Sequence, residues 1–151
     1  MKHLSRILPV GNIVLDLPAS SKKRAFEQAG LLFENHNGLE RAAVFDSLFA
    51  REKLGSTGLG EGVAVPHGRV KGINQSVAAF VRLANPVPFD APDAKPVNLM
   101  LFLMAPENAA QQHLDILAEL AELFSDDALR ARLQVESDPL VVHKLLTGSQ
   151  A

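Results

Sequence analysis

Apolar positions follow two patterns along the chain, compact runs and helical spacing, and these patterns alternate. The compact runs predict β-strands at residues 13–15, 63–65, 76–83 and 97–104, the last three of them in the interior of a sheet. A first helix is expected to begin at Ser20 or Ser21, whose hydroxyl can cap it, and to continue to about residue 36. A second helix is expected over about residues 39–53, before Gly55.

The C-terminal part of the chain predicts three more helices, at about residues 108–124, 126–134 and 138–147. In the first of these, His113 shares one side with the apolar residues Ile116, Leu117, Leu120, Leu123 and Phe124. The other two begin at Ser125-Asp126 and at Ser137-Asp138-Pro139, which are typical helix starts.

The segment between the last two predicted strands carries prolines in the stretches 85–88 and 91–93, which predict turns or a loop. No internal repeat, low-complexity tract or linker interrupts the sequence. Strands separated by helical segments favour the α/β class. We therefore expect a single layered domain over residues 1–151, in which helices flank a mixed β-sheet.

The amino-acid composition excludes several kinds of chemical site and of partner. The chain has no cysteine, which excludes disulfides, zinc–thiolate sites, iron–sulfur clusters and cysteine nucleophiles. Fifteen Lys and Arg against seventeen Asp and Glu give a formal charge of -2, so no basic field favours a nucleic-acid partner. No apolar run approaches the roughly 20 residues of a membrane span, and Pro9, Gly11 and Asp16 interrupt any signal-peptide core. We expect a cytoplasmic protein that is not embedded in a membrane.

His67 is the histidine whose local sequence points to chemistry. It lies between Pro66 and Gly68 at the end of a short apolar run, a context that presents an imidazole to a partner rather than packing it. Neutral imidazole forms covalent intermediates near pH 7, so phosphoryl transfer through His67 is the hypothesis. His113 is either an ordinary helix residue or a second imidazole of the site. Surface or cap roles are expected for the three other histidines, His3, His36 and His143.

Four glycines, Gly55, Gly58, Gly60 and Gly62, resemble a phosphate-binding loop. Glu61-Gly62 stands where a P-loop requires Lys and Ser or Thr, and Val63 stands where a dinucleotide fingerprint requires its third glycine. No nucleotide cofactor is therefore expected. Two interpretations stay open: a flexible turn between helix and strand, or a backbone cradle for a phosphoryl group with the hydroxyls of Ser56 and Thr57 nearby.

The segment from Arg51 to Arg69, Arg-Glu-Lys-Leu-Gly-Ser-Thr-Gly-Leu-Gly-Glu-Gly-Val-Ala-Val-Pro-His-Gly-Arg, resembles the signature of a known family. The family comprises the IIA domains of the phosphoenolpyruvate-dependent sugar phosphotransferase system, of the fructose, mannitol and nitrogen-regulatory type. Ser21-Lys22-Lys23-Arg24-Ala25 and Gln112-His113-Leu114 extend the resemblance over nearly the whole chain. The resemblance implies a mixed β-sheet flanked by helices.

The resemblance also implies roles for individual residues. His67 matches the histidine that accepts a phosphoryl group from the phosphocarrier HPr or its nitrogen-branch paralogue. Arg51 and His113 stand at the positions that the family places around that histidine. Glu61 matches an acidic position of mannitol-type members, where it either orients an imidazole or is simply solvated. Positioning and electrostatics suffice for such a transfer, so neither a metal nor another cofactor is expected.

Within the family, a free-standing IIA domain whose first long helix begins Ser-Lys-Lys-Arg is most similar to the nitrogen-regulatory branch. That branch implies regulatory partners such as potassium-transport or sensor-kinase proteins. The alternative is a fructose- or mannitol-type IIA subunit that passes its phosphoryl group to a sugar-specific IIB protein. Two rivals from other classes are a metal-binding module built from His67, His113 and Glu61, and a ligand-binding domain whose histidine is incidental.

Overall fold

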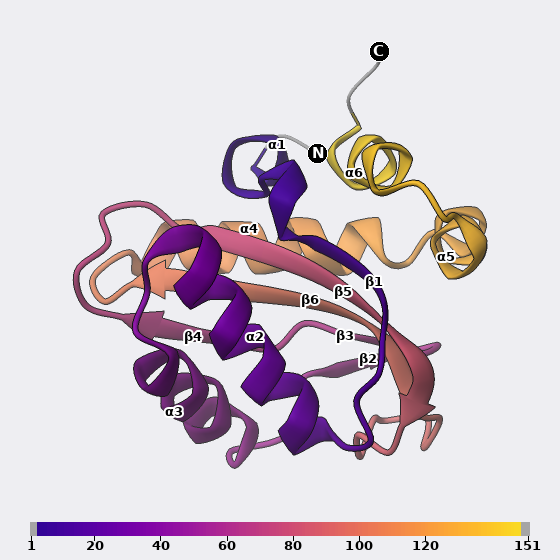
Figure 1. The fold of residues 1–151 in the computed structure, drawn as a ribbon, viewed down its shortest axis with the longest axis horizontal. Coiled ribbons are helices and arrows are strands. Elements are labelled where there is room, and N and C mark those ends of the chain that lie inside the picture. The colour runs from indigo at the N-terminus through magenta and orange to yellow at the C-terminus, as the bar shows by residue number, and fades with distance from the viewer. Residues whose placement is uncertain (1–2, 149–151) are drawn as a thin grey trace.

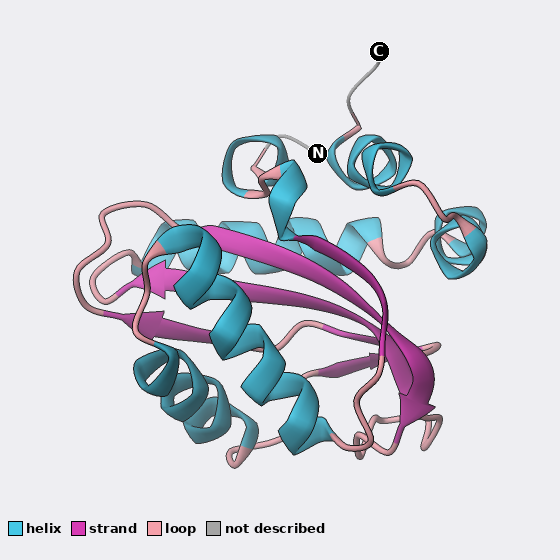
Figure 2. Ribbon diagram, viewed as in Figure 1, coloured by secondary structure: helices cyan, strands magenta, loops and turns pink. Residues whose placement is uncertain are grey.

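The computed structural model describes residues 3–148, which form a six-stranded mixed sheet between two layers of helices (Figures 1 and 2). The strands are β1 (Ile13–Leu17), β2 (Gly58–Gly60), β3 (Val63–Ala64), β4 (His67–Val70), β5 (Val77–Val87) and β6 (Val97–Pro106). The helices are α1 (Leu4–Ile7), a 3-10 turn (Val10–Asn12), α2 (Lys22–Asn37), α3 (Arg41–Glu52), α4 (Ala110–Leu123), α5 (Asp127–Val135) and α6 (Pro139–Thr147). The predicted α/β fold, a mixed sheet flanked by helices, is confirmed.

The two central strands, β5 and β6, bury both of their faces. Helices α2 and α3 cover one face of the sheet, and α4 covers the other together with α1, α5 and α6 (Figure 1). Successive residues of a strand point to opposite faces, so Leu101 packs toward α4 while Phe102 packs toward α2. This double burial explains why both strands read as continuous apolar runs. Among residues 3–148, no helix has the length and apolar character needed to cross a bilayer.

The long helices begin and end where their side chains predict. Ser21 Oγ accepts a hydrogen bond from Arg24 N at 3.1 Å at the start of α2, and Gly38 ends this helix with a left-handed φ of 70°. Asp126 and Asp138 cap α5 and α6 in the same way, each through its carboxylate. The predicted starts of these three helices are confirmed.

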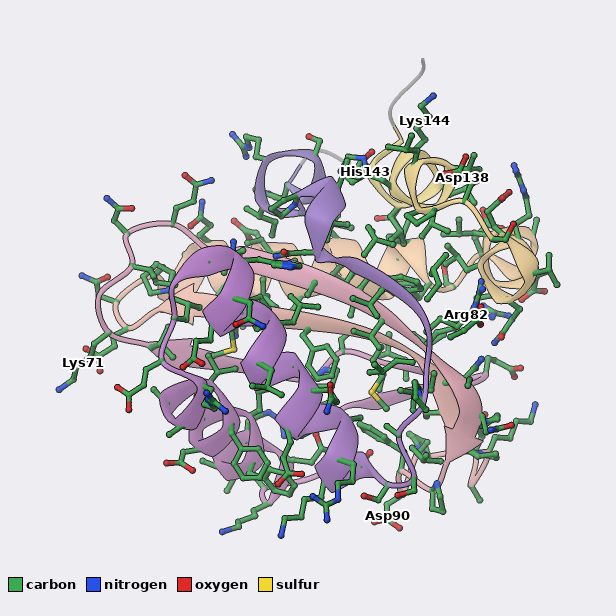
Figure 3. All side chains as sticks on the ribbon, viewed as in Figure 1. Lys71, Arg82, Asp90, Asp138, His143 and Lys144 are labelled. Atoms are coloured by element: carbon green, nitrogen blue, oxygen red, sulfur yellow. The ribbon has the colours of Figure 1, made fainter. Side chains whose placement is uncertain are left out.

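Buried polar contacts hold the C-terminal helices to the sheet (Figure 3). Arg82, only 5% exposed, extends from β5 toward α5 and donates to the carbonyl oxygens of Leu133 and Glu136 at 2.8 and 2.7 Å. It also donates to the carboxylate of Asp16 at the end of β1. The arginine thereby satisfies the last carbonyls of α5, which has no further turn to bond them.

The structure differs from the sequence expectations in three places. Residues 85–87 continue β5 instead of forming a turn, with an irregular register between Arg82 and Val87. The glycine segment is no flexible turn, because Gly58–Gly60 pairs with β3 as a short hairpin. His67, which lies in none of the predicted strands, begins β4.

The register of β6 explains why His67 lies in a strand. β3 and β4 pair in parallel with successive parts of β6, with Val63 opposite Leu99 and His67 opposite Leu103. Pro66, which has no N–H to donate, stands between the two short strands. A free edge of β6 therefore imposes extended backbone on a segment whose own composition does not favour it.

β4 is held on its other side by α3. A Cβ atom at Gly68 would collide with the side chain of Ser47, so only glycine lets the strand lie this close to the helix. Ser47 Oγ accepts a hydrogen bond from Arg69 N at 2.8 Å and donates one to Arg69 O at 2.9 Å. The backbone beside His67 is thus fixed between β6 and α3.

Candidate functional site

Side chains from α3, β4 and α4 meet around a surface cavity of about 400 Å³. Its polar lining comes from Arg51, His67, Arg69, His113 and Ser47, and its remaining lining from Ala50, Leu54, Gly68, Leu114 and Leu117. Both histidines and the arginine that the sequence predicted as site residues lie here together. The cavity combines two imidazoles and two guanidinium groups, and none of the described residues that line it carries a carboxylate.

The His67 imidazole is neutral, and one of its nitrogens has no hydrogen-bond partner among residues 3–148. Its Nδ1 lies 2.8 Å from the Val65 carbonyl oxygen, and because a carbonyl only accepts, the proton belongs to Nδ1. The lone pair is therefore on Nε2. Burial lowers the pKa of His67 below 6.5, and the positive charges of Arg51 and Arg69 lower it further, against the opposing effect of the Val65 carbonyl. The side chain is half-buried, and a neutral imidazole of this kind can act as a nucleophile.

His113 lies beside His67 on the first turns of α4. The two ring centroids are 5.2 Å apart, and His113 is 4% exposed. Its Nδ1 is buried without a hydrogen-bond partner among residues 3–148. A buried N–H without an acceptor is rarer than an unused acceptor, so we assign the proton to Nε2. Burial, followed by the charges of His67 and Arg69, lowers the pKa of His113 to about 4.

This low pKa predicts that the protein loses stability in acid. In the unfolded chain the imidazole of His113 binds a proton near 6.5, but in the folded protein only near 4. The unfolded state thus binds more protons between these values, and the free energy of unfolding falls as the pH falls from 6.5 toward 4. We expect a loss of about 2 kcal/mol, less than the full linkage value because solvent at the cavity screens the site.

Urea denaturation at a series of pH values measures this loss. His113→Gln does not titrate and should flatten most of the profile, with the lowered pKa of His67 accounting for the slope that remains. Equal slopes in the parent protein and the variant would contradict the assignment to His113.

Arg51 lies in the last turn of α3, and its Nη1 donates to Gly55 O at 2.8 Å. The turn after the helix is itself fixed by the buried carboxylate of Glu52. Its Oε2 accepts from Lys22 Nζ at 2.9 Å and from Thr57 N at 3.0 Å, and its Oε1 accepts from Thr57 Oγ1 at 2.6 Å. A buried ion pair therefore sets the position from which Arg51 reaches the cavity.

The three supporting residues that the sequence indicated are not among the residues lining the cavity. Ser56 Oγ donates to Phe89 O at 2.9 Å, and the Thr57 hydroxyl is used by Glu52. Glu61 is exposed at the turn between β2 and β3 and forms an ion pair with Lys95 at 3.2 Å, so of its two interpretations the solvated one fits. Within residues 3–148, no group of three histidine or carboxylate side chains is placed to hold a metal ion, so the metal-binding rival lacks its ligand set.

The other histidines have structural partners. His36 Nδ1 is 3.1 Å from Asn12 Oδ1, and His143 Nε2 donates to Leu8 O at 2.8 Å, between α6 and the segment that follows α1 (Figure 3). His3 is hydrogen-bonded to Arg6.

Sequence reasoning missed Arg69 and Ser47, which both line the cavity. Had residues 67–70 been read as a strand, the period of two would have placed Arg69 on the face of His67. Ser47 carried no such signal, because a serine in the middle of an amphipathic helix is unremarkable until a second element is packed against it.

The family model for the phosphoenolpyruvate-dependent sugar phosphotransferase system, EIIA 2, matches residues 6–148. The chain therefore belongs to this family of IIA proteins, and the resemblance that the motif around His67 indicated is confirmed.

Similarity to individual proteins indicates which kind of IIA protein this chain resembles. The chain is 40% identical to the nitrogen regulatory protein of Pseudomonas aeruginosa over 151 residues, which span 99% of this chain and 98% of that protein. The crystal structure of nitrogen regulatory protein IIA-Ntr from Neisseria meningitidis has 52% identity and a TM-score of 0.90, covering 95% of this chain and 98% of that one. An Escherichia coli complex of enzyme IIA mannitol with phosphorylated enzyme IIB mannitol has 26% identity and a TM-score of 0.78, over 95% of this chain and all of that one (100%). The chain is thus an IIA protein similar to nitrogen-regulatory members.

Proposed function

We propose that this chain is a phosphohistidine carrier of the nitrogen-regulatory type, which accepts a phosphoryl group on His67 and regulates its partners by its phosphorylation state. The observation that supports the proposal most directly is the His67 imidazole itself. It is neutral, its Nδ1–H is bonded to Val65 O, and its Nε2 is free at a cavity lined by two arginines. Family membership supports the same chemistry.

The transfer needs no group beyond the two histidines and their surroundings. His67 Nε2 attacks the phosphorus of a phosphohistidine on the donor; a P–N bond forms here as the donor's P–N bond breaks, and the donor imidazole leaves with the electron pair. The new positive charge on the His67 ring lies next to the Val65 carbonyl, which stabilises it through Nδ1–H. His113, with its proton on Nε2, can donate to a phosphoryl oxygen.

Arg51 is expected to offset the charge that the equatorial oxygens carry during transfer, and this role predicts a rate effect. Removing a charge-assisted contact at a partly desolvated site costs on the order of 1.5–3 kcal/mol. Arg51→Ala should therefore slow phosphoryl uptake about 10- to 100-fold with limiting donor. Rapid-quench measurement of the phosphorylated fraction tests this. Arg24→Ala is the control, because Arg24 is exposed on α2, away from the cavity lining, and forms a surface ion pair with Glu27. Uptake by Arg51→Ala at the parental rate would remove Arg51 from the site.

A protein donor would dock on the rim of the cavity, for which HPr or its nitrogen-branch paralogue is the proposed carrier. Leu54 and Leu114 border His67 and are 84% and 58% exposed. Large apolar side chains with such exposure are typical of interaction surfaces. The same rim would serve the regulated partners, such as potassium-transport or sensor-kinase proteins. A phosphoryl group on His67 would add a charge of roughly -1.5 to -2 at the centre of this rim, and this charge would change which protein surfaces bind there.

Intact mass tests the carrier function. Incubation with phosphoenolpyruvate and the general carrier proteins should add one phosphoryl group, bound as an acid-labile and alkali-stable phosphoramidate. No mass gain would overturn the proposal and favour a ligand-binding domain whose histidine is incidental.

The regulatory role is separated from sugar transport by comparing the two phosphorylation states. Affinity capture with unmodified and phosphorylated protein should give different sets of bound proteins. The alternative, a transport IIA, is favoured by the mannitol complex, in which a protein of the same fold is paired with phosphorylated IIB. Identical partner sets, together with efficient onward transfer to a sugar-specific IIB protein, would select this alternative.

A further inference from the structure

Arg69 shares a strand face with His67. The two residues are at alternate positions of β4, opposite Ala105 and Leu103 of β6, so their side chains leave the strand on the same side. Both line the cavity, and the positive charge of Arg69 lowers the pKa of His67 and of His113. The guanidinium group is thus close enough to act on both imidazoles.

The side chain of Arg69 is nearly free of partners within the protein. Among residues 3–148 its one hydrogen bond runs from Nη1 to Glu107 O at 3.5 Å, at the limit of such contacts. Arg51 differs, because its Nη1 is committed to Gly55 O at 2.8 Å. A guanidinium group has five N–H donors in a fork that matches two oxygens of a phosphate. Arg69 therefore has more N–H donors available for a phosphate than Arg51 has, because Arg51 is already bonded to Gly55 O.

The backbone of Arg69, by contrast, has no freedom. Ser47 Oγ binds both its N–H and its carbonyl, at 2.8 and 2.9 Å, and Gly68 lets α3 approach closely enough for this double contact. A long flexible side chain is thus carried on a fixed Cα atom beside the nucleophile. Such an arrangement suits a group that closes on its ligand without moving the strand.

We propose that Arg69 is a second phosphate ligand of the site, whose guanidinium group binds the oxygens of the phosphoryl group as it is transferred to His67. This inference rests on the proposed function of His67. Arg69 acts through its charge and its N–H donors and forms no covalent bond itself. It balances charge on the equatorial oxygens of the phosphoryl group, in addition to Arg51 and His113.

Two phosphoryl donors distinguish a contact of Arg69 with the phosphoryl group from a contact of Arg69 with the carrier protein. One donor is phosphoramidate, a small ion whose P–N bond breaks as His67 Nε2 binds phosphorus and ammonia leaves. The other is a phosphorylated HPr-like carrier. Arg69→Gln should slow phosphorylation about 10- to 100-fold with both donors, whereas Arg69→Lys, which keeps the charge without the fork, should fall between parent and Gln variant.

Lys71→Gln is the matched control, since Lys71 is exposed just beyond β4 and extends into solvent (Figure 3). The Lys71→Gln variant loses one positive charge, as Arg69→Gln does, and its rate of phosphorylation by phosphoramidate should equal that of the parent protein. A second readout is the Arg69 Nε–Hε signal in nitrogen-15 NMR spectra, which should shift on phosphorylation of the parent protein and stay unchanged in His67→Ala under the same treatment.

The results distinguish the inference from the proposed function. A parental phosphoramidate rate in Arg69→Gln, with slowing confined to the carrier protein, would overturn the phosphate contact and assign Arg69 to the docking surface. An equal rate loss in Lys71→Gln and Arg69→Gln would show that the rate depends only on the net charge of the protein. That result would also overturn the phosphate contact of Arg69. If instead the parent protein takes no phosphoryl group on His67 from either donor, the proposed function itself fails.

Discussion

Replacing His67 by alanine is expected to abolish phosphoryl uptake while leaving the protein folded. The variant loses the cavity-lining imidazole of His67, whose proton is held on Nδ1 by Val65 O and whose Nε2 carries the lone pair. It also loses the contact with His113 and the hydrogen bond to Val65, for which we expect a cost of about 1 kcal/mol. Intact mass after incubation with phosphorylated carrier measures uptake, and thermal unfolding measures stability.

The controls for this variant remove an imidazole elsewhere. His36→Ala and His143→Ala lose hydrogen bonds to Asn12 and Leu8 but leave the cavity unchanged, so both should still gain one phosphoryl group. A His67→Ala protein that gains the group at the parental rate would refute the assignment. An acid-stable adduct would point to a hydroxyl, with Ser56 or Thr57 as the candidates.

The helices and the central strands could be predicted because their signals are local. Ser21 caps α2 and Gly38 ends it, and both act through hydrogen bonds and dihedral angles within a few residues. The run at 97–104 is apolar throughout because β6 is buried on both faces. The short elements could not be predicted in this way. α1 spans only Leu4–Ile7, a single turn with no period to detect.

The site was predicted in part for the same reason. The motif around His67 and the position of Arg51 are local, but the meeting of His67 with His113 depends on the sheet. β4 pairs in parallel with β6, and α4 begins shortly after β6 ends, so the topology brings both histidines to one end of the sheet. Arg69 escaped notice because His-Gly-Arg-Val has little strand character of its own. The extent of the domain, residues 1–151, stays a prediction.

The second large effect is expected at Glu52, which lies outside the cavity. Its side chain is 5% exposed and receives hydrogen bonds from the Lys22 ammonium, the Thr57 hydroxyl and the Thr57 N–H. Glu52→Ala leaves these donors without their acceptor, and Lys22 is itself only 19% exposed. Breaking one side of such a buried pair costs about 3 kcal/mol or more, which is a large part of the stability of a domain this size.

Urea denaturation of Glu52→Ala beside Glu27→Ala tests this expectation. Glu27 also pairs with a cation, Arg24, but at the surface, where such pairs contribute about 0.5 kcal/mol. At temperatures where it stays folded, Glu52→Ala should also transfer phosphate more slowly, because the turn that carries Gly55 and anchors Arg51 has lost its support. Similar small losses of stability in both variants would show that the buried pair does not hold this turn. A large loss with unchanged transfer would show that Arg51 needs no such anchor.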